Sequence, residues 1–218
     1  MERRHVTPMT GKKNMSNPFD SGYYSSEELK NAGFNSVGQD VLIAKNCTIV
    51  GLENISIGSH VRIDSYTSIL AGKAGVVIGN YVHIASSCYL GGRAGIIFED
   101  FSGLSQGVRI YSQTDDYNSG MYTNPTVPKE YTKIKSGPVK LEKHVIVGSG
   151  TVILPGCTLS KGTSVGALSL IRKTTEEWKV YFGNPARIIG SRKTIDEDGS
   201  IEMKLLAKNK EEAWNTGA

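Results

Sequence analysis

The chain has 218 residues, of which 25 are Lys or Arg and 21 are Asp or Glu, for a net charge of +4. This length suffices for one domain with a complete core, and so mild and scattered a charge gives no indication of a nucleic-acid partner. No apolar run reaches the roughly 18 residues that a membrane-spanning helix needs. We therefore expect one globular domain and no membrane partner.

The first 24 residues carry positive charge without an apolar segment behind it, which excludes a signal peptide. We predict a flexible N-terminal tail over 1–24, with Met15 as an alternative start. The chain has three cysteines, Cys47, Cys88 and Cys157, and no CxxC motif. An odd number of cysteines inside a regular pattern indicates buried free thiols, and thus a cytoplasmic protein.

A short helix is predicted just after this tail. Ser25 is followed three residues later by Glu28, which is the spacing of a capping box. The helix should run from about Glu27 to Asn31 and end near Gly33. We expect it to cover the N-terminal end of the repeats that follow.

From Val37 onward the chain repeats with a period of six, as in "VGQDVL" from Val37, "IGSHVR" from Ile57 and "IGNYVH" from Ile78. The longest unbroken run extends from Leu141 into the unit that begins at Ile171. Each unit has an aliphatic or aromatic residue at position one and often a small or acidic residue at position two. Because this period fits neither a single strand nor a helix, we predict short strands joined by tight turns. Three units make a triangular coil, and position one points into a shared core.

The repeat is interrupted once at length. From Ile110 to Leu141 the chain runs for 31 residues, so roughly 25 residues lie outside the pattern. Long loops in compact folds commonly carry function. We predict an extruded active-site loop over 111–139.

After the last repeat the chain reads "GNPAR" over Gly183–Arg187. We place the end of the repeat domain, 25–192, just beyond this stretch. Residues 193–218 have mixed charge and are predicted to form a partly helical C-terminal tail, with a short helix over Glu202–Lys210.

These features together resemble the hexapeptide-repeat acyltransferases, from about Ser25 to Arg192. The resemblance implies an all-β fold, the left-handed parallel β-helix, and acyl-CoA as co-substrate without a metal. In that family the "GNPAR" stretch closes the prism beside the CoA site. The resemblance also implies a homotrimer whose active sites lie between subunits.

The long loop refines the resemblance. Members that acetylate hydroxyl groups carry a catalytic histidine in a context like S-H-D-Y, whereas this chain reads Thr114-Asp115-Asp116-Tyr117. With "YTNPTVP" and "LEKHVIVGSG", this looks like the subgroup that N-acylates nucleotide-linked 4-amino-4,6-dideoxy sugars for O-antigen and lipopolysaccharide synthesis. The resemblance makes Asp115 catalytic, together with Ser105 ten residues before it.

The substitution of aspartate for histidine is chemically coherent for an amine acceptor. A hydroxyl must lose its proton as it attacks a thioester, and so needs a good base such as histidine. A neutral amine already has a lone pair, so Asp115 need only orient it and accept the proton released after the C–N bond forms. The oxyanion would be held by a hydroxyl or a backbone N–H, with Ser105 and Gly107 as candidates.

Other polar residues are candidate substrate contacts. Asp116 is expected to cap the loop or orient the substrate. The tyrosines, among them Tyr111 and Tyr117, either stack on a nucleotide base or pack the loop. His83 is a further substrate contact and an alternative base.

The resemblance also supplies a CoA site. Pantetheine is expected to follow backbone groups near three residues, Ser149, Gly166 and Ala167. Cations in the last coil and its exit would bind the phosphates, and the candidates are Lys173, Arg187 and Arg192.

Three alternatives remain open at this point. One is an O-acetyltransferase of the galactoside or serine type that uses another base. Another is a β-helix that is non-enzymatic or resembles a carbonic anhydrase, although the spacing of His60, His83 and His144 argues against zinc. The third concerns the substrates, since a dTDP or a GDP sugar, and an acetyl or a longer acyl group, are all compatible with the sequence.

Overall fold

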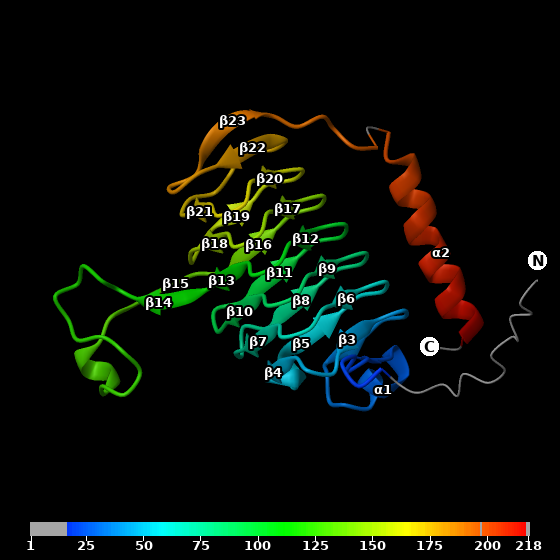
Figure 1. Ribbon diagram of the computed structural model, residues 1–218, viewed down its shortest axis with the longest axis horizontal. Helices are drawn as coiled ribbons and strands as arrows, with labels where there is room; N and C mark the ends of the chain where they lie inside the picture. The colour runs from blue at the N-terminus through cyan, green and yellow to red at the C-terminus, as the bar shows by residue number, and fades with distance from the viewer. Residues whose placement is uncertain (1–16, 197, 217–218) are drawn as a thin grey trace, which may run out of the picture.

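The computed structural model describes residues 17–196 and 198–216, with side chains to residue 208. In this part of the chain, parallel strands stack into a prism with three faces (Figure 1). Within the repeats, strands that follow one another along the chain lie on different faces, and each pairs with the strand one coil away. The left-handed parallel β-helix predicted from the repeat is confirmed.

Face A is the nine-stranded sheet. Its parallel strands are β3 (Leu42–Ala44), β6 (Arg62–Ile63), β9 (His83–Ile84), β12 (Gly103–Leu104), β17 (Ile146–Val147), β20 (Ser164–Val165) and β22 (Lys179–Phe182). Antiparallel strands cover its two ends, and these are β1 (Tyr23–Tyr24) and β23 (Arg187–Ser191).

Faces B and C are six-stranded sheets. Face B consists of β2 (Ser36–Val37), β5 (Ile55–Ile57), β8 (Val76–Ile78), β11 (Ile96–Phe98), β16 (Val139–Leu141) and β19 (Thr158–Leu159). Face C consists of β4 (Thr48–Val50), β7 (Ser68–Ala71), β10 (Tyr89–Gly92), β13 (Arg109–Tyr111), β18 (Val152–Ile153) and β21 (Leu170–Ile171). A 3₁₀ turn, η1 (Leu52–Asn54), lies between β4 and β5.

Position one of each unit points into the prism. On face A, for example, Ile63 pairs with Ile84 and Ile84 pairs with Leu104, and all three are at most 2% exposed. Burial of a side chain of this size contributes about 2 kcal/mol relative to leaving it in water. The inward column therefore accounts for the register of all three faces.

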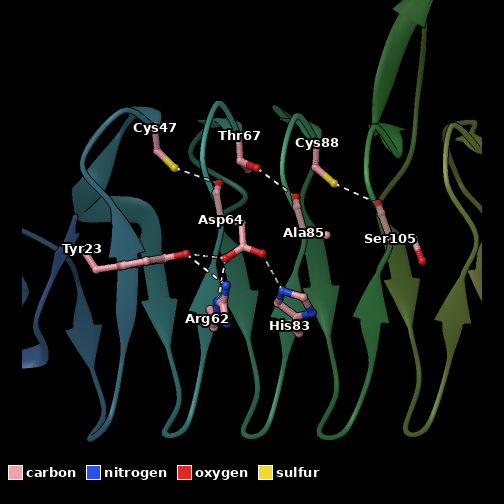
Figure 2. Close-up of polar contacts among 9 residues, drawn as sticks. All are labelled: Tyr23, Cys47, Arg62, Asp64, Thr67, His83, Ala85, Cys88 and Ser105. Atoms are coloured by element: carbon pink, nitrogen blue, oxygen red, sulfur yellow. Dashed lines mark hydrogen bonds and ion pairs between the residues drawn. The ribbon is translucent and has the colours of Figure 1, made fainter. Parts of the chain in front are cut away.

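The corners of the prism are held by side chains as well as by backbone. Cys47, Thr67 and Cys88 each donate to the carbonyl of a corner residue in the next coil, at 3.2, 3.2 and 3.3 Å (Figure 2). Cys88 and Cys157 are buried, which raises the pKa of both thiols to about 11, and Cys47 is half-buried. All three cysteines are free thiols.

A column of rings runs along the corner between faces B and A. It consists of His60, Tyr81, Phe101, His144 and Trp178, each with a positive φ between 54° and 63°. Successive ring centroids are 4.6, 5.0, 5.4 and 6.1 Å apart. Because left-handed backbone is unfavourable for residues with a Cβ, the ring stacking and the corner hydrogen bonds offset its cost.

The N-terminal helix α1 (Ser26–Lys30) begins after Ser25, which forms both halves of the capping box with Glu28. It lies one residue earlier than the sequence predicted. Leu29 is 4% exposed and packs on the core, so α1 covers the N-terminal end of the prism. Of the predicted tail over 1–24, the first sixteen residues lie outside the described part.

The long interruption forms an arm that we define as residues 112–138. Strand β14 (Gln113–Asp115) pairs antiparallel with β15 (Ile134–Ser136), and the 3₁₀ turn η2 (Lys129–Tyr131) lies beyond them. The arm projects away from the prism, as Figure 1 shows. It leaves after β13 on face C and returns before β16 on face B.

The C-terminal helix α2 (Ser200–Thr216) is longer than the predicted Glu202–Lys210 and lies on the opposite side of the prism from the arm (Figure 1). It is attached to the corner by Glu202, which binds Lys143 and lies 3.3 Å from His144 Nε2, and by Tyr81, whose hydroxyl donates to the Leu205 carbonyl at 3.0 Å. In the described part of the chain, no helix is both long and apolar enough to span a membrane.

Two neighbouring isoleucines of β11 test the inward column. Ile96 is 0% exposed and Ile97 is 38% exposed. Ile96→Ala should lower the free energy of unfolding by about 2–5 kcal/mol, because it leaves a cavity in the core. Ile97→Ala should cost about 0.5 kcal/mol or less. Urea denaturation followed by circular dichroism measures both, and equal losses would contradict the assignment of the inward face.

Candidate active site

A groove runs along face A, with a cavity volume of about 510 Å³. We call it the face-A groove, and its lining includes His83, Gly103, Ser105, Ser149 and Arg192. Its depth follows from the register. Gly103 pairs between His83 on β9 and Ile146 on β17, in a column whose side chains point outward, so the missing side chain leaves a hollow.

His83 is held at the edge of this groove by Asp64. Its Nε2 lies 2.9 Å from Asp64 Oδ2. The other carboxylate oxygen, Oδ1, accepts hydrogen bonds from Arg62 Nε at 2.7 Å and from the Tyr23 hydroxyl at 2.8 Å. Figure 2 shows the three partners converging on Asp64 from β1, β6 and β9.

The Asp64 carboxyl is 17% exposed, whereas the His83 side chain is 54% exposed. Burial alone would raise the pKa of Asp64, but the hydrogen bonds from His83, Arg62 and Tyr23 outweigh it and bring the pKa below its ordinary value. Asp64 is therefore a carboxylate at neutral pH and can only accept hydrogen bonds.

Ser105 lies in the same groove and its hydroxyl has no hydrogen-bond partner among the described residues. The backbone N–H of Ser105 donates to Val147 at 2.8 Å, and that of Gly107 donates to Ser86 at 3.0 Å. Both amides considered as oxyanion donors are thus used inside the prism. The Ser105 hydroxyl is the one group of these that remains available.

Asp115 lies at the end of β14, on the arm, and its Oδ2 accepts a hydrogen bond from the Asn124 amide at 3.2 Å. The arm leaves the corner between faces C and B, which in a three-sided prism is the corner opposite face A. Tyr117, also on the arm, is 81% exposed, and Tyr111 lies on face C against Tyr89 at a ring distance of 5.4 Å. One copy of the chain does not bring these residues to its own face-A groove.

Asp116 braces the arm. Its side chain is 10% exposed, and its carboxylate lies 2.9 Å from Lys135 Nζ and 3.8 Å from Lys133 Nζ. It also accepts a hydrogen bond from the Asn118 amide at 3.2 Å. The hydrogen bond from Lys135 is the largest of the effects that lower the pKa of this carboxyl.

A second cavity, of about 400 Å³, lies at the C-terminal end of the prism. Lys173 and Arg187, both predicted as phosphate ligands, line it together with Arg172. None of these three cations forms an ion pair within the described residues. An uncompensated group of cations in a cavity suits an anionic ligand such as a phosphate.

Arg192 is placed differently from the other predicted phosphate ligands. Its guanidinium donates to the carbonyls of His144 at 2.6 Å and Gly162 at 3.1 Å, and lies 5.9 Å from the Trp178 ring. Burial lowers its pKa from the ordinary value. These contacts attach the C-terminal segment to the ring column and form one wall of the face-A groove.

The backbone near Gly166 is largely committed to the prism. Its amide donates to Tyr181 at 2.8 Å, and a Cβ at this position would lie 2.4 Å from the Phe182 ring. Ala167 is exposed at the same corner, and its amide has no partner among the described residues. Of this pair, Ala167 is the one that can meet a ligand with its backbone.

No protein-family model matches the chain. The dTDP-4-amino-4,6-dideoxy-D-glucose acyltransferase of Escherichia coli is 40% identical over 189 residues, which cover 86% of this chain and 98% of that protein. This chain belongs to the left-handed β-helix acyltransferase family.

Solved structures support the assignment of this chain to the acyltransferase family. AntD, an N-acyltransferase from Bacillus cereus in complex with dTDP and 3-hydroxybutyryl-CoA, is 39% identical, with a TM-score of 0.78 over 87% of this chain and 98% of AntD. Other AntD structures carry a substitution of one aspartate, or of one serine ten positions before it. A putative lipopolysaccharide biosynthesis O-acetyl transferase of Escherichia coli K12 is 27% identical over 72% of this chain and 87% of that protein.

Sequence reasoning missed four residues that the structure places at these sites, namely Tyr23, Arg62, Asp64 and Arg172. Asp64 and Arg172 both occupy position two of their units. The acidic residue at this position could have drawn attention to Asp64. Whether such a residue belongs to a site depends on which side chains lie next to it in the neighbouring coil. Because the coils differ in length, the sequence alone did not bring Asp64 and His83 together.

The role of Asp116 can be tested by hydrogen exchange. Its folded-state pKa is depressed, so its stabilising effect on the arm is present above the ordinary carboxyl pKa and is lost as pH falls through the lowered value. Backbone amides of β14 and β15 should lose protection at acidic pH in the wild type, and at every pH in Asp116→Asn. Exchange measured by mass spectrometry, corrected for the intrinsic effect of pH, reports both.

Asp115→Asn is the matched control for this experiment, because an amide oxygen can still accept the Asn124 hydrogen bond. Its arm should exchange as in the wild type. Unchanged protection in Asp116→Asn would show that the arm does not depend on this carboxylate.

Proposed function

We propose that this acyltransferase transfers the acyl group of an acyl-CoA to the amine of a dTDP-linked 4-amino-4,6-dideoxy sugar, for O-antigen or lipopolysaccharide synthesis. One observation carries the choice of acceptor: a carboxylate, Asp115, lies on the arm, ten residues after a serine in the groove. The same pair of residue types, at the same spacing, was substituted in AntD, which was solved with dTDP-4-amino-4,6-dideoxyglucose and CoA. We take acetyl as the first acyl group to test.

The active protein is proposed to be a homotrimer with composite sites. The arm and the face-A groove lie on opposite sides of one prism, so Asp115 can meet Ser105 only if the arm comes from a second copy. A ring of three copies gives each groove one arm through a head-to-tail contact. The three free thiols of each chain suit a reducing compartment, and we propose that the enzyme is cytoplasmic.

Each group has a role in the proposed site. The neutral amine attacks the thioester carbonyl, and Asp115 accepts a hydrogen bond from the amine, which orients its lone pair and stabilises the positive charge that develops. The Ser105 hydroxyl donates to the oxyanion. Tyr117, exposed on the arm, is available to stack on the nucleotide base, with Tyr111 nearer the prism.

For the acyl donor we propose a path past Ser149 and the exposed amide of Ala167. Its phosphates would bind Lys173, Arg187 and Arg172 at the C-terminal cavity. Arg192 would act on the donor only through the groove wall that it holds in place.

O-acyl transfer is the second candidate function. The pairing of His83 with Asp64 provides an imidazole base in the groove, which a hydroxyl acceptor requires. A 4-hydroxy sugar nucleotide tested beside the 4-amino sugar separates the two functions.

The composite site predicts complementation between two inactive variants. Release of CoA thiol from acetyl-CoA with a dTDP-4-amino-4,6-dideoxyhexose should fall at least about 100-fold in Asp115→Asn and about 10-fold or more in Ser105→Ala, because each removes a transition-state contact. Trimers co-assembled from equal amounts of the two should regain about a quarter of wild-type activity, since in a ring one site in four receives an intact arm and an intact groove.

The control is a mixture of the two variants, purified separately and combined without exchange of subunits, which should show only the average of their separate residual activities. No recovery after verified co-assembly would contradict a site shared between chains. Turnover that survives Asp115→Asn would move the amine contact elsewhere.

The cations of the C-terminal cavity predict an effect on the acyl donor alone. Lys173→Glu or Arg187→Glu should raise KM for acetyl-CoA about tenfold through loss of a charge-assisted phosphate contact, with kcat and the KM of the sugar nucleotide unchanged. Lys73→Glu, at an exposed corner several coils away, is the charge-matched control. Steady-state kinetics with both substrates varied would refute the assignment if KM for acetyl-CoA did not change.

A further inference from the structure

We propose that His83 is the proton acceptor of the acyl transfer, with Asp64, Arg62 and Tyr23 as positioning residues. This inference rests on the proposed function and assigns the proton to a group other than Asp115. All four residues belong to one chain, so this part of the site does not require a second copy.

The first support is the way in which Asp64 is held. Its carboxylate is nearly covered, and three donors from three levels of the prism converge on it. An ordinary surface ion pair between His83 and Asp64 would not require two further donors to hold the carboxylate, because a surface pair gains little from a fixed geometry. The arrangement instead fixes the orientation of the His83 ring, which lines the groove.

The second support is the tautomer that this geometry imposes. The Asp64 carboxylate can only accept hydrogen bonds, so Nε2 of a neutral His83 must carry the hydrogen. The lone pair of the ring is then on Nδ1, which Asp64 does not occupy. A carboxylate has the same two effects in a Ser-His-Asp triad, where it selects the tautomer and stabilises the imidazolium that forms.

The third support is the space in front of the ring. Gly103 pairs with His83 in the outward column. The small Ala85 follows β9, and its amide donates to the Leu104 carbonyl, next to Ser105, at 3.0 Å. All of these residues line the face-A groove. A reacting centre in this hollow would have the imidazole of His83 on one side and the unpaired hydroxyl of Ser105 on the other, and Figure 2 shows both side chains on this side of the prism.

The proton then follows a balanced path. The amine nitrogen forms a bond to the thioester carbon, and the carbonyl electron pair moves to oxygen, which gives an oxyanion and an ammonium. His83 Nδ1 removes one N–H proton from this ammonium and becomes imidazolium. The oxyanion re-forms the carbonyl as the C–S bond breaks, and the departing thiolate takes the proton from Nδ1, which yields the amide, CoA thiol and neutral His83.

This path divides the work between two groups that come from different chains. Asp115 of the arm orients the amine and balances its charge, and the imidazole moves the proton to the leaving group. A carboxylate is a much weaker base than an imidazole, so Asp115 is the poorer of the two for the second task.

Kinetics of His83 variants test the proposal. His83→Gln should lower kcat by about 100-fold or more and change neither KM by more than about threefold, because the ring acts after both substrates are bound. Asp64→Asn should lower kcat by about tenfold, again without a change in KM, through loss of the tautomer and of the carboxylate charge. Added imidazole should restore part of the activity of His83→Ala, because the free base can enter the vacated space.

His60→Gln is the matched control. His60 also pairs with an aspartate, Asp40, at 3.1 Å, but lies outside the face-A groove, so the variant should keep wild-type kinetics. Wild-type kcat in His83→Gln, or a change in KM alone, would overturn the proposal and leave N-acylation intact. An enzyme that acylates a 4-hydroxy but not a 4-amino sugar nucleotide, and needs His83 to do so, would overturn the acceptor and keep the role of His83. Inactivity of the wild type with both acceptors would overturn both.

Discussion

The structure depends on one constraint, the burial of position one of every hexapeptide in a column shared by all coils. No coil can bury its own aliphatic residue, so each coil is stable only against its neighbours. This constraint fixes which residues face outward and at what level. The face-A groove follows from this constraint. In the outward column Gly103 is the neighbour of His83, and at the adjoining corner the small Ala85 precedes Ser105 by one coil, so little side-chain volume fills the space.

The fold could be predicted from the sequence because period six is a strong signal and because inward positions are chosen for size and apolarity. The capping box of α1 and the point at which the arm leaves the prism were readable for the same local reasons. The pairing of His83 with Asp64 was not. These residues are 19 positions apart, and the length of the intervening coil is set by corner insertions whose conformation the sequence pattern does not give.

The site residues, too, were predictable where the signal was local in sequence and not where it depended on spatial arrangement. Sequence reasoning selected Ser105 and Asp115 through a family motif, and selected Lys173 and Arg187 through charge beside the last coil. It had no means of placing the arm on the far side of the prism from the groove, because that relation depends on the corner at which the arm leaves the coils. It also assigned Arg192 by its charge alone, whereas the structure uses the guanidinium to hold two backbone carbonyls and a tryptophan ring.

The base of the arm has a consequence for how such enzymes diverge. Where the arm leaves and re-enters the prism, Gly137 donates to the Ser112 carbonyl at 3.0 Å, and Ser112 in turn binds the Gly91 carbonyl and the Ala94 amide one coil away. The prism is therefore closed beneath the arm, as if the interruption were an ordinary corner. An insertion, deletion or exchange within the arm should therefore leave every coil in register. If the arm contacts the acceptor as proposed, acceptor preference would change by exchange of this one segment, with the coils left as they are.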